Sequence, residues 1–335
     1  MDRARRSALR RMAWLLAALP VSGLSQQLAR TVPRRVALCL AASSAPDPIG
    51  PAKTSSAKEF AKHGLVDGRD IEIVILRSRS WATLEEVLAP VRQAVALRAG
   101  VILTFMGGAA MKVNLLAISR DIPLVVWGPD DGSGDTIEML NRRGENVTGA
   151  MVPYIELLTK RFELMKELRP NAKRAAVVTK FVRPADGGED ETRRIVDMYT
   201  ARARKLGMEF ALIELREEAS ADDVIRALRN ARIDIAEFLC CKSPPLWERL
   251  AKGEIAASVV GPEGVRDGAL LGGWSVGYVE AAIRLAARVL RGERAAAIPV
   301  ERPMEYGLAI NLRTARTLGI TVPASVLVRA QEVFE

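Results

Sequence analysis

The residues that could support chemistry begin at Val101–Met111, VILTFMGGAAM, an apolar run that ends in two glycines and small residues. Such a run is typical of a buried parallel strand that turns tightly into a helix N-terminus. A ligand could approach the backbone of that turn closely, because free N–H groups with a partial positive charge favour polar or anionic groups. We therefore expect Gly107, Gly108 and Ala109 to touch a small ligand. Glycines that only close a strand–helix turn are the alternative.

Further candidates follow other predicted strands, because ligands of open α/β sheets lie beyond the carboxyl ends of the strands. Serine hydroxyls could donate to a ligand carboxylate, an acid could pair with an ammonium group, a lysine could pair with an anion, and aromatic rings could stack on a flat ligand. Each residue type also has a plain structural use in turns, on the surface or in packing. The candidates are Ser43, Ser44, Asp130, Tyr154, Phe181, Lys242, Glu263 and Trp274.

The sequence has few residues for catalysis or metal binding. His63 is the only histidine and no Cys-x-x-Cys pair is present, which excludes the usual zinc spacings. We also find no nucleophile elbow, phosphate loop or calcium loop. We therefore expect no enzyme, no metal and no cofactor. Cys39 and Cys240 lie in apolar runs that predict buried thiols, and the sequence leaves open whether Cys39 pairs with Cys240 or Cys241.

Composition and charge are those of a mildly basic α/β protein. Nearly half of the 335 residues are hydrophobic and only 5% are aromatic, which suits Ala-rich helices packed closely on sheets. The formal net charge is +9, and five Arg and Asp2 within residues 1–25 account for four of these charges. The other positive charges are interspersed with acidic residues. Without a basic stripe and stacking aromatics, we expect no nucleic-acid partner.

Residues 1–25 are predicted to be a cleavable signal peptide. An arginine-rich stretch precedes the apolar run MAWLLAALPV, which is too short to span a bilayer, and Gly23 and Ser25 provide small residues for cleavage. The pair Arg5-Arg6 also resembles a twin-arginine signal, so the general secretory and twin-arginine routes are both open. An uncleaved N-terminal anchor and a basic amphipathic extension are the alternatives. We expect an exported protein that is soluble after cleavage.

Strands alternate with helices from Arg34 onward. Thr83 and Ser220 are predicted N-caps, with Glu86 at the capping-box position and Asp223 in the first turn of its helix. The alternation runs in two series of similar length, which a stretch rich in Gly, Asp and Asn at 128–149 separates. This order predicts an α/β protein with two doubly wound parallel-sheet lobes.

Several segments, in their order and spacing, resemble a known family. They are IPLVVWG with a following Asp-Gly turn, GENVTG, LTKRFELMKELRPNAKRAAVV and the C-terminal run VLRGERAAAIPVERPMEYGLAINLRTARTLGITVPASVLVRAQEVFE. The chain from Arg34 to Glu335 is similar to the substrate-binding proteins of ABC transporters with the type I periplasmic-binding fold. Within that group it resembles relatives that bind tryptophan or phenylalanine.

The resemblance implies two lobes joined by three crossovers, with a ligand in the cleft between them. Lobe one is then expected to hold 34–147 and 274–309, and lobe two 148–273 and 310–335. The implied function is capture of a small organic ligand, an amino acid or similar small acid, by hinge closure. A periplasmic monomer would then deliver this ligand to an ABC permease in the inner membrane. A ligand-sensing module that feeds a membrane receptor is the alternative.

Three departures from the family pattern concern the cleft. The segment 244–275 is shorter, GPEGVRDG replaces a turn that bears Tyr or Ser, and Trp274 changes the usual Ser-Tyr-Gly crossover to Gly-Trp-Ser. These departures predict a ligand that differs from those of studied relatives, or a relative that has lost ligand binding.

Overall fold

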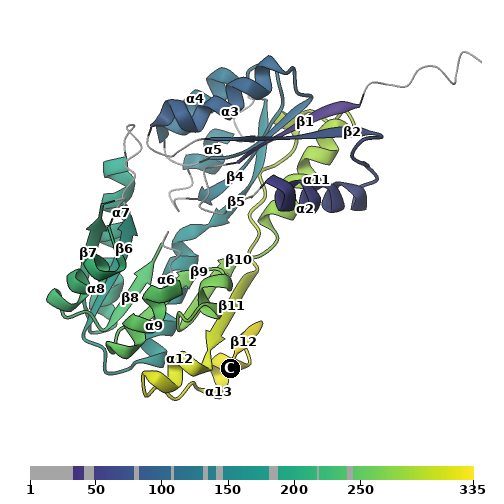
Figure 1. Ribbon diagram of the computed structural model, residues 1–335. Helices are drawn as coiled ribbons and strands as arrows, with labels where there is room; N and C mark the ends of the chain where they lie inside the picture. Colours follow the sequence, from purple (N-terminus) through teal and green to yellow (C-terminus); the bar gives the residue numbers. More distant parts are fainter. Residues whose placement is uncertain are drawn as a thin grey trace, which may run out of the picture.

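The computed structural model of the chain describes residues 33–40, 49–78, 83–106, 109–130, 135–140, 146–180, 188–216, 219–239 and 244–335 (Figure 1). These residues form two α/β lobes, each built on its own sheet. The lobes lie one above the other in Figure 1, and the chain passes between them along their shared side. The predicted fold class, two parallel-sheet lobes joined by crossovers, is confirmed.

The lobe-one sheet has the strand order β2-β1-β3-β4-β5, and all its pairs are parallel. Its strands are β1 (Arg34–Leu40), β2 (Ile71–Arg77), β3 (Val101–Phe105), β4 (Leu124–Asp130) and β5 (Val147–Pro153). One face packs on α2 (Ile49–Lys62) and α11 (Tyr278–Leu290), and the other on α3 (Leu84–Ala96) and α4 (Ala109–Ile118). The short α5 (Asp135–Leu140) precedes β5. Alanines of α11 let this helix approach the sheet closely, as the composition predicted.

The lobe-two sheet has the order β12-β11-β10-β9-β8-β6-β7. Its strands are β6 (Arg174–Lys180), β7 (Glu209–Leu215), β8 (Ile235–Phe238), β9 (Ala256–Val260), β10 (Leu271–Ser275), β11 (Tyr306–Asn311) and β12 (Glu332–Phe334). Helices α6 (Tyr154–Leu168) and α7 (Gly188–Lys205) cover one face, and α8 (Ala221–Asn230) and α9 (Pro244–Lys252) cover the other. The remaining helices are α10 (Glu263–Arg266), η2 (Ala295–Ala297), α12 (Leu312–Thr317) and α13 (Ala324–Leu327).

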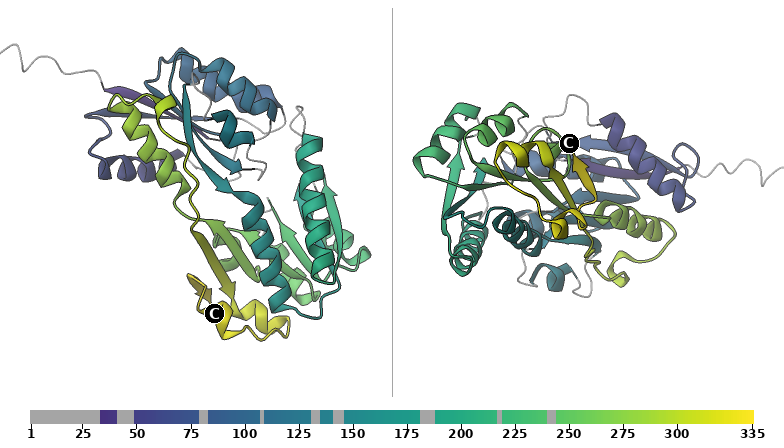
Figure 2. Two further views of the ribbon diagram at one scale, coloured as in Figure 1. Left: turned by 180° about the vertical axis from the view of Figure 1, so that it is seen from behind. Right: turned by 90° about the horizontal axis from the view of Figure 1, so that it is seen from below.

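The two sheets repeat one strand order. Within lobe two, β7-β6-β8-β9-β10 follows the same order as β2-β1-β3-β4-β5 in lobe one, and β11 is then added antiparallel to β10. The fifth strand of each set leads into a helix of the opposite lobe: β5 leads into α6, and β10 leads into α11. Each lobe therefore receives one helix from the other, which ties the lobes together at the crossovers (Figures 1 and 2).

The predicted lobe boundaries need correction, because each falls inside a strand. β5 stays paired with β4 as far as Pro153, while β10 and β11 pair with each other in lobe two over residues 271–275 and 306–311. A strand belongs to one sheet along its whole hydrogen-bonded length. The chain therefore crosses after Pro153, after Ser275 and before Tyr306, and not at residues 147, 273 and 309.

Hydrogen bonds join the crossovers side by side. Met151 N donates to Glu301 O at 2.8 Å, and Glu301 N donates to Gly149 O at 2.8 Å. Val276 N donates to Glu305 O at 2.9 Å. Ion pairs continue this link into both lobes, since Arg284 of α11 pairs with Glu301, and Arg302 pairs with Glu156 of α6. The crossovers therefore form one connected hinge.

Both predicted helix caps are confirmed. Thr83 accepts a hydrogen bond from Glu86 N at the start of α3. Ser220 and Asp223 form a reciprocal capping box at the start of α8. Pro90 lies inside α3. Within the described ranges, no helix is long and apolar enough to cross a membrane.

Candidate ligand-binding cleft

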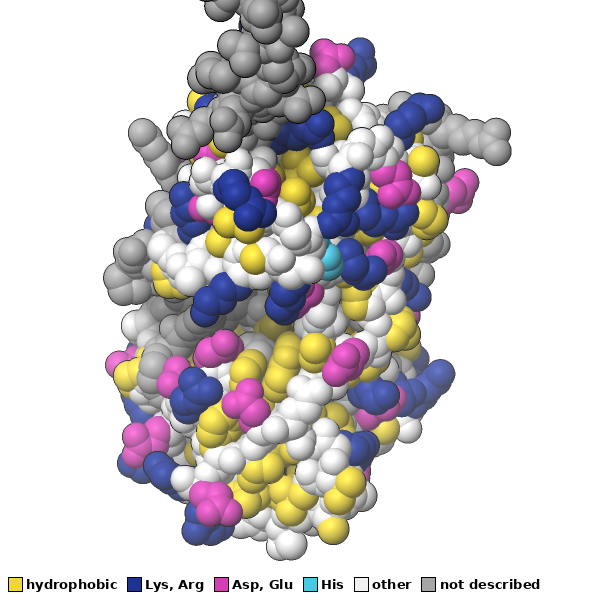
Figure 3. Space-filling view, turned by 90° about the vertical axis from the view of Figure 1, so that its right-hand side faces the viewer, with side chains coloured by type: hydrophobic (Ala, Val, Ile, Leu, Met, Phe, Trp, Pro, Cys, Tyr) yellow, Lys and Arg dark blue, Asp and Glu magenta, His cyan; other side chains and the backbone are white. Residues whose placement is uncertain are grey.

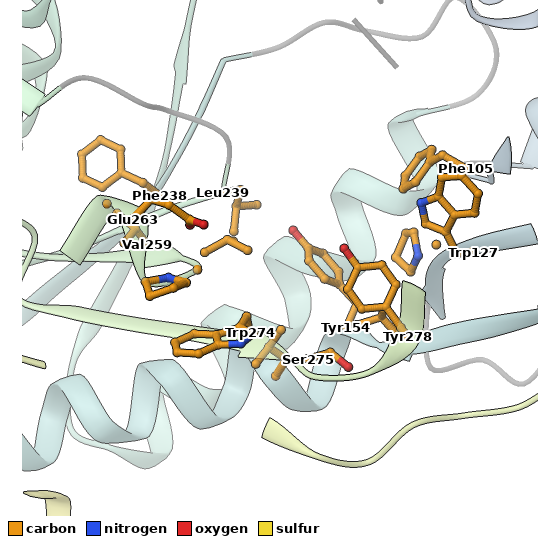
Figure 4. Close-up of a pocket in the computed structure, with 18 of the residues that line it drawn as sticks. Phe105, Trp127, Tyr154, Phe238, Leu239, Val259, Glu263, Trp274, Ser275 and Tyr278 are labelled. Atoms are coloured by element: carbon orange, nitrogen blue, oxygen red, sulfur yellow. The ribbon is translucent and has the colours of Figure 1, made fainter. Parts of the chain in front are cut away.

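A cavity of about 860 Å³ lies between the lobes, where the carboxyl ends of strands from both sheets meet. In Figure 3 a recess separates the upper lobe, which carries many Lys and Arg side chains, from the lower lobe, where apolar side chains gather. The described part of the wall is mostly apolar and aromatic (Figure 4). It includes Phe105, Trp127, Pro129, Val152, Tyr154, Leu157, Leu239, Val260, Glu263, Trp274, Ser275 and Tyr278.

Two aromatic side chains form the lobe-one wall. Phe105, the last residue of β3, is the register neighbour of Trp127 in β4, and Figure 4 shows their rings beside each other. Met106 N donates to Trp127 O at 2.7 Å, which holds the end of β3 against β4. Gly128 makes this approach possible, because a Cβ at that position would lie 2.0 Å from Met106 O. The wall therefore offers a rigid flat surface to a ligand.

Two tyrosines stand at equivalent points of the two crossovers. Tyr154 is the first residue of α6, directly after β5, and Tyr278 is the first residue of α11, after β10. Figure 4 shows both rings beside each other with their hydroxyls directed into the cavity. Burial, with a smaller effect of the Glu280 charge, raises the pKa of Tyr278. Its hydroxyl therefore stays protonated near neutral pH and can both donate and accept a hydrogen bond.

The lobe-two wall depends on glycines that make room for larger side chains. Trp274 of β10 is paired with Gly307 of β11, and a Cβ on Gly307 would lie 2.1 Å from the indole Cε2 atom. The indole therefore lies flat across the neighbouring strand. Gly261, with φ +84°, follows β9, and a Cβ there would lie 2.7 Å from Glu263 Oε2. The backbone of this turn therefore passes directly beneath the Glu263 carboxylate.

A buried polar cluster lies behind the cavity wall, on the α6 face of the lobe-two sheet. Arg161 Nε donates to Glu237 Oε1 at 2.5 Å, and Tyr199 Oη donates to Glu237 Oε2 at 2.7 Å. Arg161 and Glu237 are 1% and 0% exposed, so the pair is fully desolvated. Burial raises the pKa of Glu237, against the opposing effects of Arg161 and Tyr199. Gly273 accommodates the Arg161 methylenes, since a Cβ there would lie 2.6 Å from Arg161 Cγ.

This cluster fixes the helix that carries Tyr154. On α6, Leu157 follows Tyr154 by three residues and Arg161 follows Leu157 by four, so all three share one face of the helix. Tyr154 and Leu157 reach the cavity, while Arg161 is held by Glu237 one layer below. The ion pair therefore sets the rotation of α6 about its axis.

The candidates predicted from the sequence have different outcomes. Tyr154, Glu263 and Trp274 line the cavity. Asp130 ends β4 next to the lining residues Gly128 and Pro129, and Ala109 begins α4, but the side chains of Asp130 and Ala109 are not described. The candidates that lie outside the described residues are Ser43, Ser44, Gly107, Gly108, Phe181 and Lys242. Cys39 is a buried free thiol, and Cys240 and Cys241 lie outside the described residues.

Sequence reasoning missed three aromatic residues of the wall, Phe105, Trp127 and Tyr278. Phe105 and Trp127 are the last aromatic residues before predicted strand-end turns, and the search for ligand contacts began one or two residues later, at the glycines. Tyr278 had a signal of its own. The runs Tyr154-Ile-Glu and Tyr278-Val-Glu stand at the start of the two crossover helices, so a short internal repeat marks both.

Solved structures first define the class of protein. An ABC domain from Streptococcus pneumonia, solved in complex with L-Trp, is 19% identical with a TM-score of 0.69, over 90% of this chain and 100% of that chain. A conserved domain protein from Vibrio cholerae is 20% identical with a TM-score of 0.68, over the same shares. CD0873 of Clostridium difficile, a substrate binding protein with adhesive properties in its ligand-free, open structure, is 18% identical with a TM-score of 0.62, over 90% and 99%. The fold is that of the type I periplasmic binding proteins.

The family follows from the sequence match. The family model of ABC transporter substrate binding proteins matches residues 57–236 and 268–334, which is more than half of the chain. The protein belongs to this family of solute-binding proteins, and the resemblance noted in the sequence is confirmed. No curated protein matches the chain.

Proposed function

We propose that the protein captures a small organic ligand between its lobes and delivers it to an ABC permease. The observation that carries this proposal is the convergence of aromatic side chains from both lobes and two crossovers on one cavity of about 860 Å³. Small-molecule sites typically have volumes of about 300–1,000 Å³ and mostly apolar walls with a few polar groups. Rotation about the hydrogen-bonded crossovers would close the lobes on the ligand.

We propose an amino acid or similar small acid with a flat apolar part as the ligand. The rings of Phe105 and Trp127 provide a surface on which such a part can stack. The streptococcal relative was solved with L-Trp, which makes aromatic amino acids the first ligands to test. We also propose that residues 1–25 direct export, and that the mature protein acts in the periplasm as a monomer with an inner-membrane permease as its partner.

A thermal-shift screen of the mature protein against amino acids and small organic acids tests this function. A ligand at about 100 times its Kd stabilises the native state by about 2.7 kcal/mol, so a saturable rise in Tm is expected. Hinge closure should also reduce the radius of gyration in X-ray scattering.

Two matched variants locate the site. Val260 lines the cavity and is 43% exposed, so Val260→Trp should fill the cleft and abolish the ligand-induced shift. Val328, which is 86% exposed and does not line the cavity, provides the control Val328→Trp, which should keep the shift. Absence of any shift across the screen, or an unchanged shift in Val260→Trp, would refute the proposal.

A further inference from the structure

We infer that the ligand charge recognised in this cleft is positive, and that an ammonium or other nitrogen cation lies between the Glu263 carboxylate and the hydroxyls of Tyr154 and Tyr278. This inference rests on the proposed function, since it concerns the same cavity. It narrows the proposed ligands to amino acids and amines, because Glu263 would disfavour a small acid that has no ammonium group.

The charges of the described wall carry the inference. Only two of the described lining residues are charged, Glu263 and Glu332, and both are acidic. Arg266 pairs with Glu332 at 3.6 Å, which balances that carboxylate. Glu263 forms no ion pair within the described residues, and its side chain borders the cavity. The cavity therefore holds one uncompensated negative charge in its described wall.

The Glu263 carboxylate lies close to the backbone of the turn that follows β9. Glu263 begins α10 two residues after Gly261, and Glu263 Oε2 lies so close above Gly261 that a Cβ there would be 2.7 Å away. Figure 4 shows the carboxylate on the lobe-two side of the cavity, opposite the two tyrosines. Glu263 is itself exposed, and apolar residues such as Leu239 and Val259 line the same part of the cavity, so the carboxylate is the charged group that a ligand would meet on this described side.

The opposite side of the cavity also suits a cation. The hydroxyls of Tyr154 and Tyr278 can accept hydrogen bonds from an ammonium group, and the faces of their rings carry negative potential. Both tyrosines begin helices, whose N-termini would by themselves favour an anion. Glu280 in the first turn of α11 offsets that partial positive charge beside Tyr278, whereas Glu156 of α6 is already paired with Arg302. A ligand carboxylate would meet the Glu263 charge without a described basic residue to balance it.

Matched ligand series separate the two charges. We would measure binding to the mature protein by calorimetry for phenethylamine, L-phenylalanine and 3-phenylpropionate, and for tryptamine, L-tryptophan and indole-3-propionate. Within each series the apolar part is kept and the charge changes from cation to zwitterion to anion. We expect the amines and amino acids to bind at least about tenfold more tightly than the acids, since a charge-assisted hydrogen bond contributes about 1.5–3 kcal/mol.

Variants assign the effect to Glu263. Glu263→Gln keeps the side-chain size and should weaken amine binding roughly ten- to hundredfold, without weakening any binding of the anions. Glu248→Gln, at an exposed acid on α9 outside the cavity, is the control and should leave affinity unchanged. Gly261→Ala and Gly207→Ala both place a side chain at positive φ, but only the first displaces the Glu263 carboxylate, so only the first should weaken amine binding.

The outcomes distinguish this inference from the function on which it rests. Anions that bind as tightly as the amines, or an unchanged amine affinity in Glu263→Gln, would overturn the inference and leave ligand capture standing. Failure of all six compounds to bind would overturn both the aromatic ligand proposed above and the inference.

Discussion

Replacing one member of the buried Arg161–Glu237 pair should strongly destabilise the protein. In Arg161→Met, Glu237 keeps the hydrogen bond from Tyr199 but loses its cation, and in Glu237→Leu the guanidinium is left without its counter-charge. Both side chains are at most 1% exposed, so water cannot compensate in the native state. We expect each single variant to cost about 3–5 kcal/mol in free energy of unfolding.

The double variant Arg161→Met/Glu237→Leu should cost less than either single variant. It leaves no buried charge, and only the Tyr199 hydroxyl loses a partner, at about 1–3 kcal/mol. The double-mutant cycle should therefore show a coupling energy of at least about 3 kcal/mol. Urea unfolding followed by circular dichroism gives the required free energies.

An exposed ion pair in the same sheet is the matched control. Arg174 and Glu209 join β6 to β7 at 2.7 Å, with side chains 43% and 72% exposed. Arg174→Met should cost less than about 1 kcal/mol, because water screens this pair. Equal losses in Arg161→Met and Arg174→Met, or costs that simply add in the double variant, would refute the role assigned to burial.

The loss in Arg161→Met should also depend on pH. Burial raises the pKa of Glu237, and Arg161 opposes this rise. A carboxyl whose pKa is raised by folding contributes stability below its unfolded pKa, and this contribution is lost as pH rises through the folded pKa. Without Arg161 the pKa rises further. The destabilisation should therefore be larger at about pH 8 than at about pH 5. A loss that does not change with pH would contradict an ionised Glu237 as its cause.

Two further predictions concern single residues. Gly307→Ala would place a Cβ 2.1 Å from the Trp274 indole, so it should lower the free energy of unfolding by about 1–3 kcal/mol and weaken ligand binding. In the control Gly100→Ala the nearest atom to the new Cβ is 3.5 Å away, so this variant should bind ligand normally. Equal ligand binding by both variants would disprove that Gly307 positions the indole. Burial raises the pKa of the Cys39 thiol to about 12, so iodoacetamide at pH 8 should modify this thiol only after unfolding. Peptide mass spectrometry measures the modification, and rapid modification of the native protein would contradict the burial of Cys39.

Features that depend on short-range interactions could be predicted from the sequence. The caps at Thr83 and Ser220 were found because a cap and its partner lie three residues apart. The alternation of strands and helices predicted two α/β lobes, because each element must bury an apolar face. Glu263 was named because it follows a predicted strand, and Tyr154 and Trp274 because their rings could stack on a flat ligand; all three line the cavity.

Features that depend on contacts between distant residues could not be predicted in this way. Arg161 and Glu237 are 76 residues apart, and neither stands in a local pattern that indicates a partner. The lobe boundaries were misplaced because strand periodicity does not reveal which sheet a strand joins.

The sequence by itself determined the elements, their caps, the family and two of the five aromatic cleft residues discussed here, Tyr154 and Trp274. The tertiary structure alone decided that Phe105, Trp127 and Tyr278 join Tyr154 and Trp274 around one cavity, with Glu263 as the unpaired charge among the lining residues that the structure describes. The physical reason is that strand order and close glycine contacts bring these side chains together. These contacts depend on the packing of segments that lie far apart in the chain.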